Sequence, residues 1–181
     1  MQRNYQISEF ARINFRELNK RTAYHEAGHA TAIYLYNKSK QLPPVFFQVH
    51  LQNHHAVVKQ NSNLKVGNMF ARIEGGRLVQ DLLFSAIDIE NYLSPHEKAD
   101  YYAALEADIV NLLAGAIAEA HYVSLIDNEV INVHLLNIPA LKNYGGHSDL
   151  QKIQEYLAIF SKNPSAQSQK LTYLLHTTFH F

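Results

Sequence analysis

Residues 22–30 read T-A-Y-H-E-A-G-H-A, and this stretch contains the pattern H-E-x-x-H. On an α-helix, residues four apart lie on one face, so His25 and His29 can direct their imidazoles at one metal ion. Glu26 lies at the edge of the same face, where its carboxylate can reach a water molecule rather than the metal. The pattern therefore predicts a helix over about residues 21–36 that carries a zinc site of the kind found in hydrolases.

Gly28 stands inside this helical run. A glycine in a helix interior costs about 1 kcal/mol relative to alanine, so its presence favours a position where the backbone closely approaches another element. A second segment offers a matching thin surface, because Ala114, Gly115 and Ala118 place small side chains on one side of a predicted helix. We expect that helix to pack tightly against a neighbour.

The composition excludes several classes of protein. The 181-residue chain has no cysteine, which removes disulfides and thiolate ligands, so a metal must take histidine and carboxylate ligands. Sixteen basic residues balance sixteen acidic ones, which disfavours nucleic-acid binding. The N-terminus lacks the apolar core of a signal peptide, and no run of about 18 apolar residues is evident, so we expect a cytoplasmic protein without a membrane span.

The remaining elements are predicted from periodicity and from helix-start and turn signals. Residues 94–97, S-P-H-E, form a capping box with proline at the first helical position, which predicts a long helix to about residue 123. The other predicted elements are a short N-terminal helix that Ser8 caps, a strand over 45–51 paired with 56–58, a helix over 69–87, and helices over 150–160 and 165–176. The segment 125–138 favours neither helix nor strand.

These elements predict a mainly α fold (α+β) with about six helices and a small β-hairpin or sheet beside the motif helix. The length fits a single domain over 1–181. We place its core at about 20–162, with the short N-terminal helix and the C-terminal helix appended.

A catalytic zinc needs three protein ligands and an open position, so the two histidines require a partner. The extended pattern H-E-x-x-H-x-x-G-x-x-H is absent, because Ala32 and Leu35 stand where it requires glycine and histidine. A glutamate on a second helix would be Glu106 or Glu119. An aspartate at the start of a later helix would be Asp149, although capping that helix is the usual role of such a residue.

Three segments, in the same order, resemble the peptidase domain of FtsH, the ATP-dependent zinc metalloprotease. Residues 22–30 resemble its metal-binding helix. Residues 110–119, V-N-L-L-A-G-A-I-A-E, resemble its L-A-G-R-x-A-E helix, and residues 145–153, G-G-H-S-D-L-Q-K-I, resemble its G-A-x-N-D-L segment. The resemblance is carried by segments within about 22–156 and is weak over 45–95 and at both ends.

The resemblance implies a helical FtsH-peptidase-like domain in which His25, His29 and Asp149 bind Zn²⁺ and Glu26 is the general base. It also implies assembly into homo-oligomeric rings. Two departures stand out: Ala116 replaces the arginine of L-A-G-R, and His147-Ser148 replaces the usual step before the aspartate. The G-x-x-x-x-G-K-S/T loop of an ATPase and the family's membrane anchor are not found in the sequence.

The leading expectation is therefore a zinc-dependent metallopeptidase, a hydrolase acting on peptides or unfolded polypeptides, with a separate ATPase as a partner. His147 and Glu119 are further candidates: His147 for contact with the oxyanion or with the ligands, and Glu119 for contact with the ligands. The first alternative is a non-proteolytic metal-binding or partner module that retains the FtsH peptidase fold. The second is a helical structural domain without a metal.

Overall fold

The computed structural model describes residues 15–52, 70–75, 89 and 91–181. Its elements in chain order are α1 (Phe15–Ser39), β1 (Phe47–Gln52), β2 (Phe70–Gly75), α3 (Pro95–Ile126), the 3₁₀ turn η2 (Val133–Leu135), α4 (Ile138–Leu141), α5 (His147–Phe160) and α6 (Pro164–Phe179). The prediction of a mainly α fold is confirmed.

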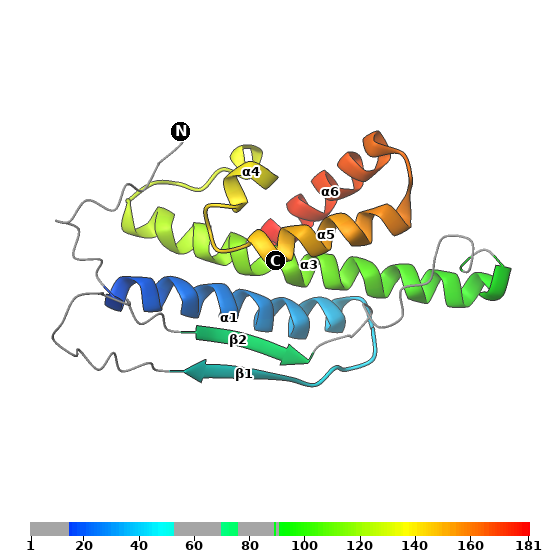
Figure 1. The fold of residues 1–181 in the computed structure, drawn as a ribbon, viewed down its shortest axis with the longest axis horizontal. Coiled ribbons are helices and arrows are strands. Elements are labelled where there is room, and N and C mark those ends of the chain that lie inside the picture. The colour runs from blue at the N-terminus through cyan, green and yellow to red at the C-terminus, as the bar shows by residue number, and fades with distance from the viewer. Residues whose placement is uncertain (1–14, 53–69, 76–88, 90) are drawn as a thin grey trace, which may run out of the picture.

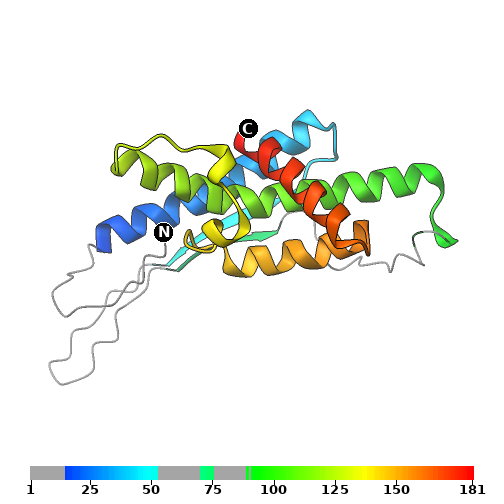
Figure 2. The same cartoon turned by 90° about the horizontal axis from the view of Figure 1, so that it is seen from above.

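Helix α3 runs the length of the molecule and organises the other elements (Figure 1). It lies antiparallel to α1 on one side, and α4, α5 and α6 lie on its other side. Figure 2 shows α6 crossing over α3 while α5 runs along it. Helix α3 thus lies between the motif helix α1 and the later helices. Side chains from α1, from α3 and from the later helices can therefore come together beside α3.

The predicted capping box starts α3. The Ser94 hydroxyl accepts a hydrogen bond from the backbone N–H of Glu97, and the Glu97 carboxylate accepts one from the backbone N–H of Ser94. Together these bonds satisfy donors that the first helical turn leaves without an intrahelical partner. The helix continues to Ile126, close to the predicted end at about residue 123.

The core forms where α3 meets its neighbours. Its fully buried members include Leu105, Ile109 and Leu113 of α3, Tyr36 of α1, Ile153 of α5 and Leu174 of α6. Because Leu174 belongs to the same cluster as the α3 residues, α6 contributes to the common core.

The N-terminal prediction is wrong in one respect. Helix α1 runs without a break from Phe15 to Ser39, so the separate short helix and the motif helix are one element over the residues that the structure describes. Residues 8–14, with the predicted Ser8 cap, lie outside the described residues.

The strand predicted at 45–51 is found as β1 at Phe47–Gln52. Its antiparallel partner is β2, with Val49 opposite Ile73, and β2 lies on the α1 side of the sheet (Figure 1). The predicted helix over 69–87 is wrong at residues 70–75, which form β2, while 56–58 and 76–87 lie outside the described residues. A two-stranded sheet therefore lies beside the motif helix.

The sequence analysis expected no segment that could span a bilayer, but by length and hydropathy alone α3 could do so. An 18-residue window of α3 has a mean hydropathy of 1.5. In the folded chain 61% of this window is buried. Its apolar composition is accounted for by its place at the centre of the helical core.

Gly28 of α1 lies in close contact with α3. A Cβ atom added at Gly28 would lie 2.4 Å from the Ala114 carbonyl oxygen and 2.7 Å from the Ala118 Cβ. The close approach and the thin α3 surface predicted from the sequence are therefore both present. The first contact is with backbone, so a side chain at this position would push the two helices apart.

We expect Gly28→Ala to lower the free energy of unfolding by about 1–3 kcal/mol, because overpacking outweighs the gain in helix propensity. Urea denaturation measures this change, and Ala27→Ser on the exposed side of the same turn is the control. Stabilisation of Gly28→Ala by about 1 kcal/mol, which helix propensity alone predicts, would contradict the packing.

Candidate metal centre

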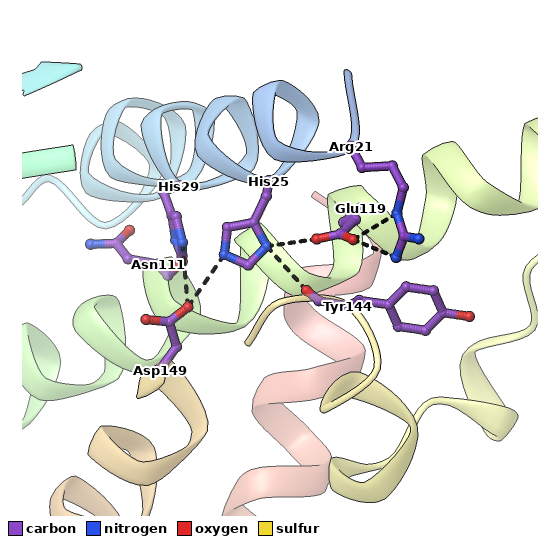
Figure 3. Close-up of polar contacts among 7 residues, drawn as sticks. All are labelled: Arg21, His25, His29, Asn111, Glu119, Tyr144 and Asp149. Atoms are coloured by element: carbon purple, nitrogen blue, oxygen red, sulfur yellow. Dashed lines mark hydrogen bonds and ion pairs between the residues drawn. The ribbon is translucent and has the colours of Figure 1, made fainter. Parts of the chain in front are cut away.

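Three side chains from two helices converge beside α3 (Figure 3). His25 and His29 come from α1, and Asp149 comes from the first turn of α5. The Asp149 Oδ2 atom lies 3.4 Å from His25 Nε2 and 3.5 Å from His29 Nε2. These three residues could hold a metal ion.

The two separations from Asp149 to the histidine nitrogens match the spacing of ligand atoms around a four-coordinate ion. Zinc binds imidazole nitrogen and carboxylate oxygen at about 2.0–2.2 Å, so two ligand atoms of a tetrahedral site lie about 3.4 Å apart. The separations of 3.4 and 3.5 Å are of this size. Two imidazoles and a carboxylate are also a donor set that suits zinc, so the residues fit the ion that the sequence predicted.

Each imidazole is oriented through its other nitrogen. His29 Nδ1 lies 2.7 Å from the backbone carbonyl oxygen of Asn111, and His25 Nδ1 lies 3.2 Å from that of Tyr144. When Nδ1–H donates to a carbonyl, the Nε2 lone pair is left for a metal. Both rings are therefore held with Nε2 turned toward Asp149.

Gly115 makes room for the two rings on the α3 surface. A Cβ atom at this position would lie 2.4 Å from His29 Nε2 and 2.8 Å from His25 Nε2. Any side chain here would occupy the space of the imidazole nitrogens. The glycine of the A-G-A stretch in α3 thus permits both ligands to rest against the helix.

The three sequence candidates for a third ligand lie in different places. Glu106 forms an ion pair with Lys170 of α6. Glu119 faces His25 from the Nδ1 side, with 3.3 Å between Oε2 and Nδ1, whereas Asp149 faces Nε2 of both rings. Of the three, only Asp149 lies on the side where a metal ion would bind.

Asp149 does not act as the N-cap of α5. The N-cap is Gly146, and it provides no side-chain hydrogen bond to the helix. Burial raises the pKa of Asp149, but hydrogen bonds and charge from His25 and His29 outweigh it and hold that pKa well below its usual range. The start of a helix also favours negative charge. The carboxylate is therefore ionised, as a metal ligand must be.

The other two candidates differ in their surroundings. Glu26 is half-buried on α1, next to His25. His147 is exposed at the first position of α5, and none of the contacts described above for His25, His29 or Asp149 involves it. The structure thus brings Glu119 to the candidate ligand His25, whereas no contact described above joins His147 to a candidate ligand.

Sequence reasoning missed three contributors to the site. Arg21 precedes His25 by four residues on α1 and hydrogen-bonds Glu119, and its helical spacing was a signal that could have identified it. The backbone carbonyls of Tyr144 and Asn111 leave no signature in residue type, so sequence alone could not find them.

In metal-free protein the pKa of His25 departs strongly from its ordinary value. Burial lowers this pKa, but hydrogen bonds and charge from Asp149 and Glu119 outweigh burial and raise it to about 9. The metal-free imidazole is therefore protonated at neutral pH. A metal ion has to displace that proton, because a ligand histidine is neutral.

We expect metal-free protein to lose stability between about pH 6.5 and pH 9. A histidine whose pKa is higher in the folded than in the unfolded protein stabilises the fold fully at pH values below its unfolded-state pKa. This stabilisation is lost as the pH rises through the folded-state pKa. At 1.36 kcal/mol per pKa unit the loss is about 3 kcal/mol. Urea denaturation of chelator-treated protein at pH 6, 7.5 and 9 measures it, with His25→Gln as the control that lacks the fall. A free energy of unfolding that is constant across this range would contradict the His25 environment.

Comparison of the chain with models of known protein families, with curated proteins and with solved structures found no match. The geometry of the site is therefore the main evidence about function.

Proposed function

We propose that this chain is a zinc-dependent metallopeptidase that hydrolyses peptide bonds of short or unfolded polypeptides. The observation that carries the proposal is the placement of Asp149 Oδ2 at 3.4 and 3.5 Å from the two Nε2 atoms of an H-E-x-x-H helix. Two imidazoles, one carboxylate and an adjacent glutamate form the donor set and base that this chemistry requires. The resemblance of three segments to the FtsH peptidase domain supports the same activity.

Zinc, when bound, supplies a Lewis acid that polarises a carbonyl and lowers the pKa of water toward about 7. The residues of the chain would supply the remaining steps. His25, His29 and Asp149 would hold the ion, and the Asn111 and Tyr144 carbonyls would keep the imidazoles oriented. Glu26 would accept a proton from the attacking water and deliver it to the amine as the carbon–nitrogen bond breaks.

The limited exposure of the site supports an extended substrate. The side chains of His25, His29 and Asp149 have exposed fractions of 10%, 13% and 19%. A carbonyl of a folded protein would not readily reach atoms so deeply placed, whereas a short peptide or an unfolded segment could. A separate ATPase that unfolds proteins would widen the range of substrates.

Cleavage of an unstructured chain tests the proposal. Purified protein is supplied with zinc and incubated with fluorescently labelled casein without ATP. We expect cleavage that a chelator stops and that added zinc restores. Zinc binding without cleavage of casein or of short peptide libraries would overturn the peptidase and favour the non-proteolytic metal-binding module.

A further inference from the structure

Arg21, His25 and Glu119 form a chain of contacts that ends on the metal centre (Figure 3). Both Nε and Nη2 of Arg21 donate hydrogen bonds to Glu119 Oε1, at 2.9 and 2.7 Å. The other oxygen, Oε2, lies 3.3 Å from Nδ1 of His25. The carboxylate therefore has one oxygen held by the guanidinium group and one turned to the ligand histidine.

The space around this carboxylate is tightly defined. Glu119 is 7% exposed, and burial raises its pKa, but His25 and Arg21 outweigh burial and lower it. Gly145 closes one side: a Cβ atom there would lie 2.9 Å from Glu119 Oε2 and 3.3 Å from His25 Nδ1. The φ of Gly145 is 75°, a conformation that residues with a side chain rarely adopt. The glycine thus leaves the carboxylate room beside His25.

Helical spacing makes Arg21 part of the same unit as the ligand. Arg21 and His25 are four residues apart on α1, so they lie on one face, one turn from each other. Glu119 reaches both of them from α3. Helix α1 therefore supplies both His25 and Arg21, and Arg21 holds Glu119, the partner of His25.

We propose that Arg21 is a positioning residue of the metal centre, which acts through Glu119 to hold His25 with Nε2 directed at the metal. This inference rests on the metal site of the proposed function but not on peptide cleavage. Both hydrogen bonds described for Arg21 reach Glu119, so the contact between Arg21 and the candidate ligand His25 runs through that carboxylate. The effect of Arg21 is on the retention of metal, because partners of ligand histidines typically change metal affinity by about 10–100-fold.

A purely electrostatic role and a positioning role of Arg21 predict opposite changes in metal affinity when Arg21 is removed. Loss of a positive charge near a bound cation would tighten metal binding by Coulomb's law alone. Loss of the clamp would free Glu119 to leave His25, because a buried carboxylate without its partner is unfavourable, and metal binding would weaken. The sign of the change therefore distinguishes a positioning role from a purely electrostatic one.

The test is a Zn²⁺ titration against a chromogenic chelator for wild type, Arg21→Met, Glu119→Gln and the double variant. We expect Arg21→Met to weaken zinc binding about 10-fold in the wild-type background. In the Glu119→Gln background we expect Arg21→Met to weaken zinc binding by less than about 2-fold, because a residue that acts through Glu119 has no effect once Glu119 is changed. Arg21→Lys, which keeps the charge and one donor, should recover part of the affinity.

Two controls keep the measurement interpretable. Lys38→Met removes one positive charge from the exposed C-terminal end of α1 and should leave zinc affinity unchanged. Thermal unfolding reports whether Arg21→Met folds. If Arg21→Met does not fold, the double variant still should, because it has no unpaired buried carboxylate. The zinc affinity of Arg21→Lys is then compared with that of wild type, and that of the double variant with that of Glu119→Gln. These two comparisons measure the effect of Arg21.

Unchanged or tighter zinc binding in Arg21→Met, or equal losses in both backgrounds, would overturn the positioning role. Absence of zinc from wild type would overturn this inference together with the proposed function. Zinc bound without peptide cleavage would overturn the peptidase alone, so the two failures are distinguishable.

Discussion

Replacing Glu26 with glutamine is expected to lower the rate of peptide cleavage by about 10²–10⁴-fold while zinc remains bound. Glutamine keeps the size of the side chain but cannot accept a proton from water. The proposed metal ligands His25, His29 and Asp149 are unchanged, so the amount of zinc per chain should stay the same. The measurement is kcat/KM on a labelled peptide, with zinc determined by elemental analysis on the same samples.

Glu155→Gln is the matched control, because Glu155 is an exposed acid on the outer side of α5. Its cleavage rate should equal that of wild type. If Glu26→Gln retained full activity, Glu26 would not be the base. If it lost zinc as well as activity, the loss could not be assigned to proton transfer.

Replacing Asp149 with alanine is expected to weaken zinc binding by more than about 100-fold. Loss of residues that only orient a ligand costs about 10–100-fold, whereas Asp149 would itself supply a ligand atom. Glu119 cannot take its place without a rearrangement, since its carboxylate faces His25 Nδ1 from the opposite side of the ring. Competition with a chromogenic chelator measures the affinity.

Asp100→Ala is the control for this variant, because Asp100 is an exposed aspartate whose partner, His96, lies outside the metal centre. It should bind zinc as wild type does. Zinc affinity in Asp149→Ala equal to that of wild type would show that the third ligand lies elsewhere in the chain.

Signals within short stretches of sequence predicted the start of α3 and the position of a close contact between two helices. The capping box at Ser94 and Glu97 forms as the sequence indicates, and Gly28 marks the close approach of α1 to Ala114. Ser94 and Glu97 are residue types that suit a helix start, and glycine suits a close backbone contact, so the residue types themselves indicated both features. The H-E-x-x-H pattern similarly predicted a helix over about residues 21–36, which lies within α1.

Distant pairing explains what the sequence did not predict. Residues 70–75 were predicted as helix but form β2, because Ala71 and Ile73 alternate with Arg72 and Glu74 and β1 supplies the partner strand. A strand pair that is separated by a long stretch of chain is not visible in a local window.

The same limit applies to the candidate site. The H-E-x-x-H pattern identified His25 and His29 because both lie within one helical turn. The residues alone left Glu106, Glu119 and Asp149 open as third ligands, and only the resemblance to a known family favoured Asp149. The packing of α5 against α3 places Asp149, and no neighbouring residue in the sequence encodes that contact.

X-ray absorption at the zinc edge of the zinc-loaded protein tests the central claim most directly. We predict one zinc per chain, four-coordinate, with two imidazole nitrogens and oxygen ligands at about 2.0–2.2 Å, and loss of this spectrum in Asp149→Ala. Protein that takes up no zinc when zinc is supplied, or a zinc site whose spectrum is the same in Asp149→Ala, would contradict the assignment of His25, His29 and Asp149 as the metal centre.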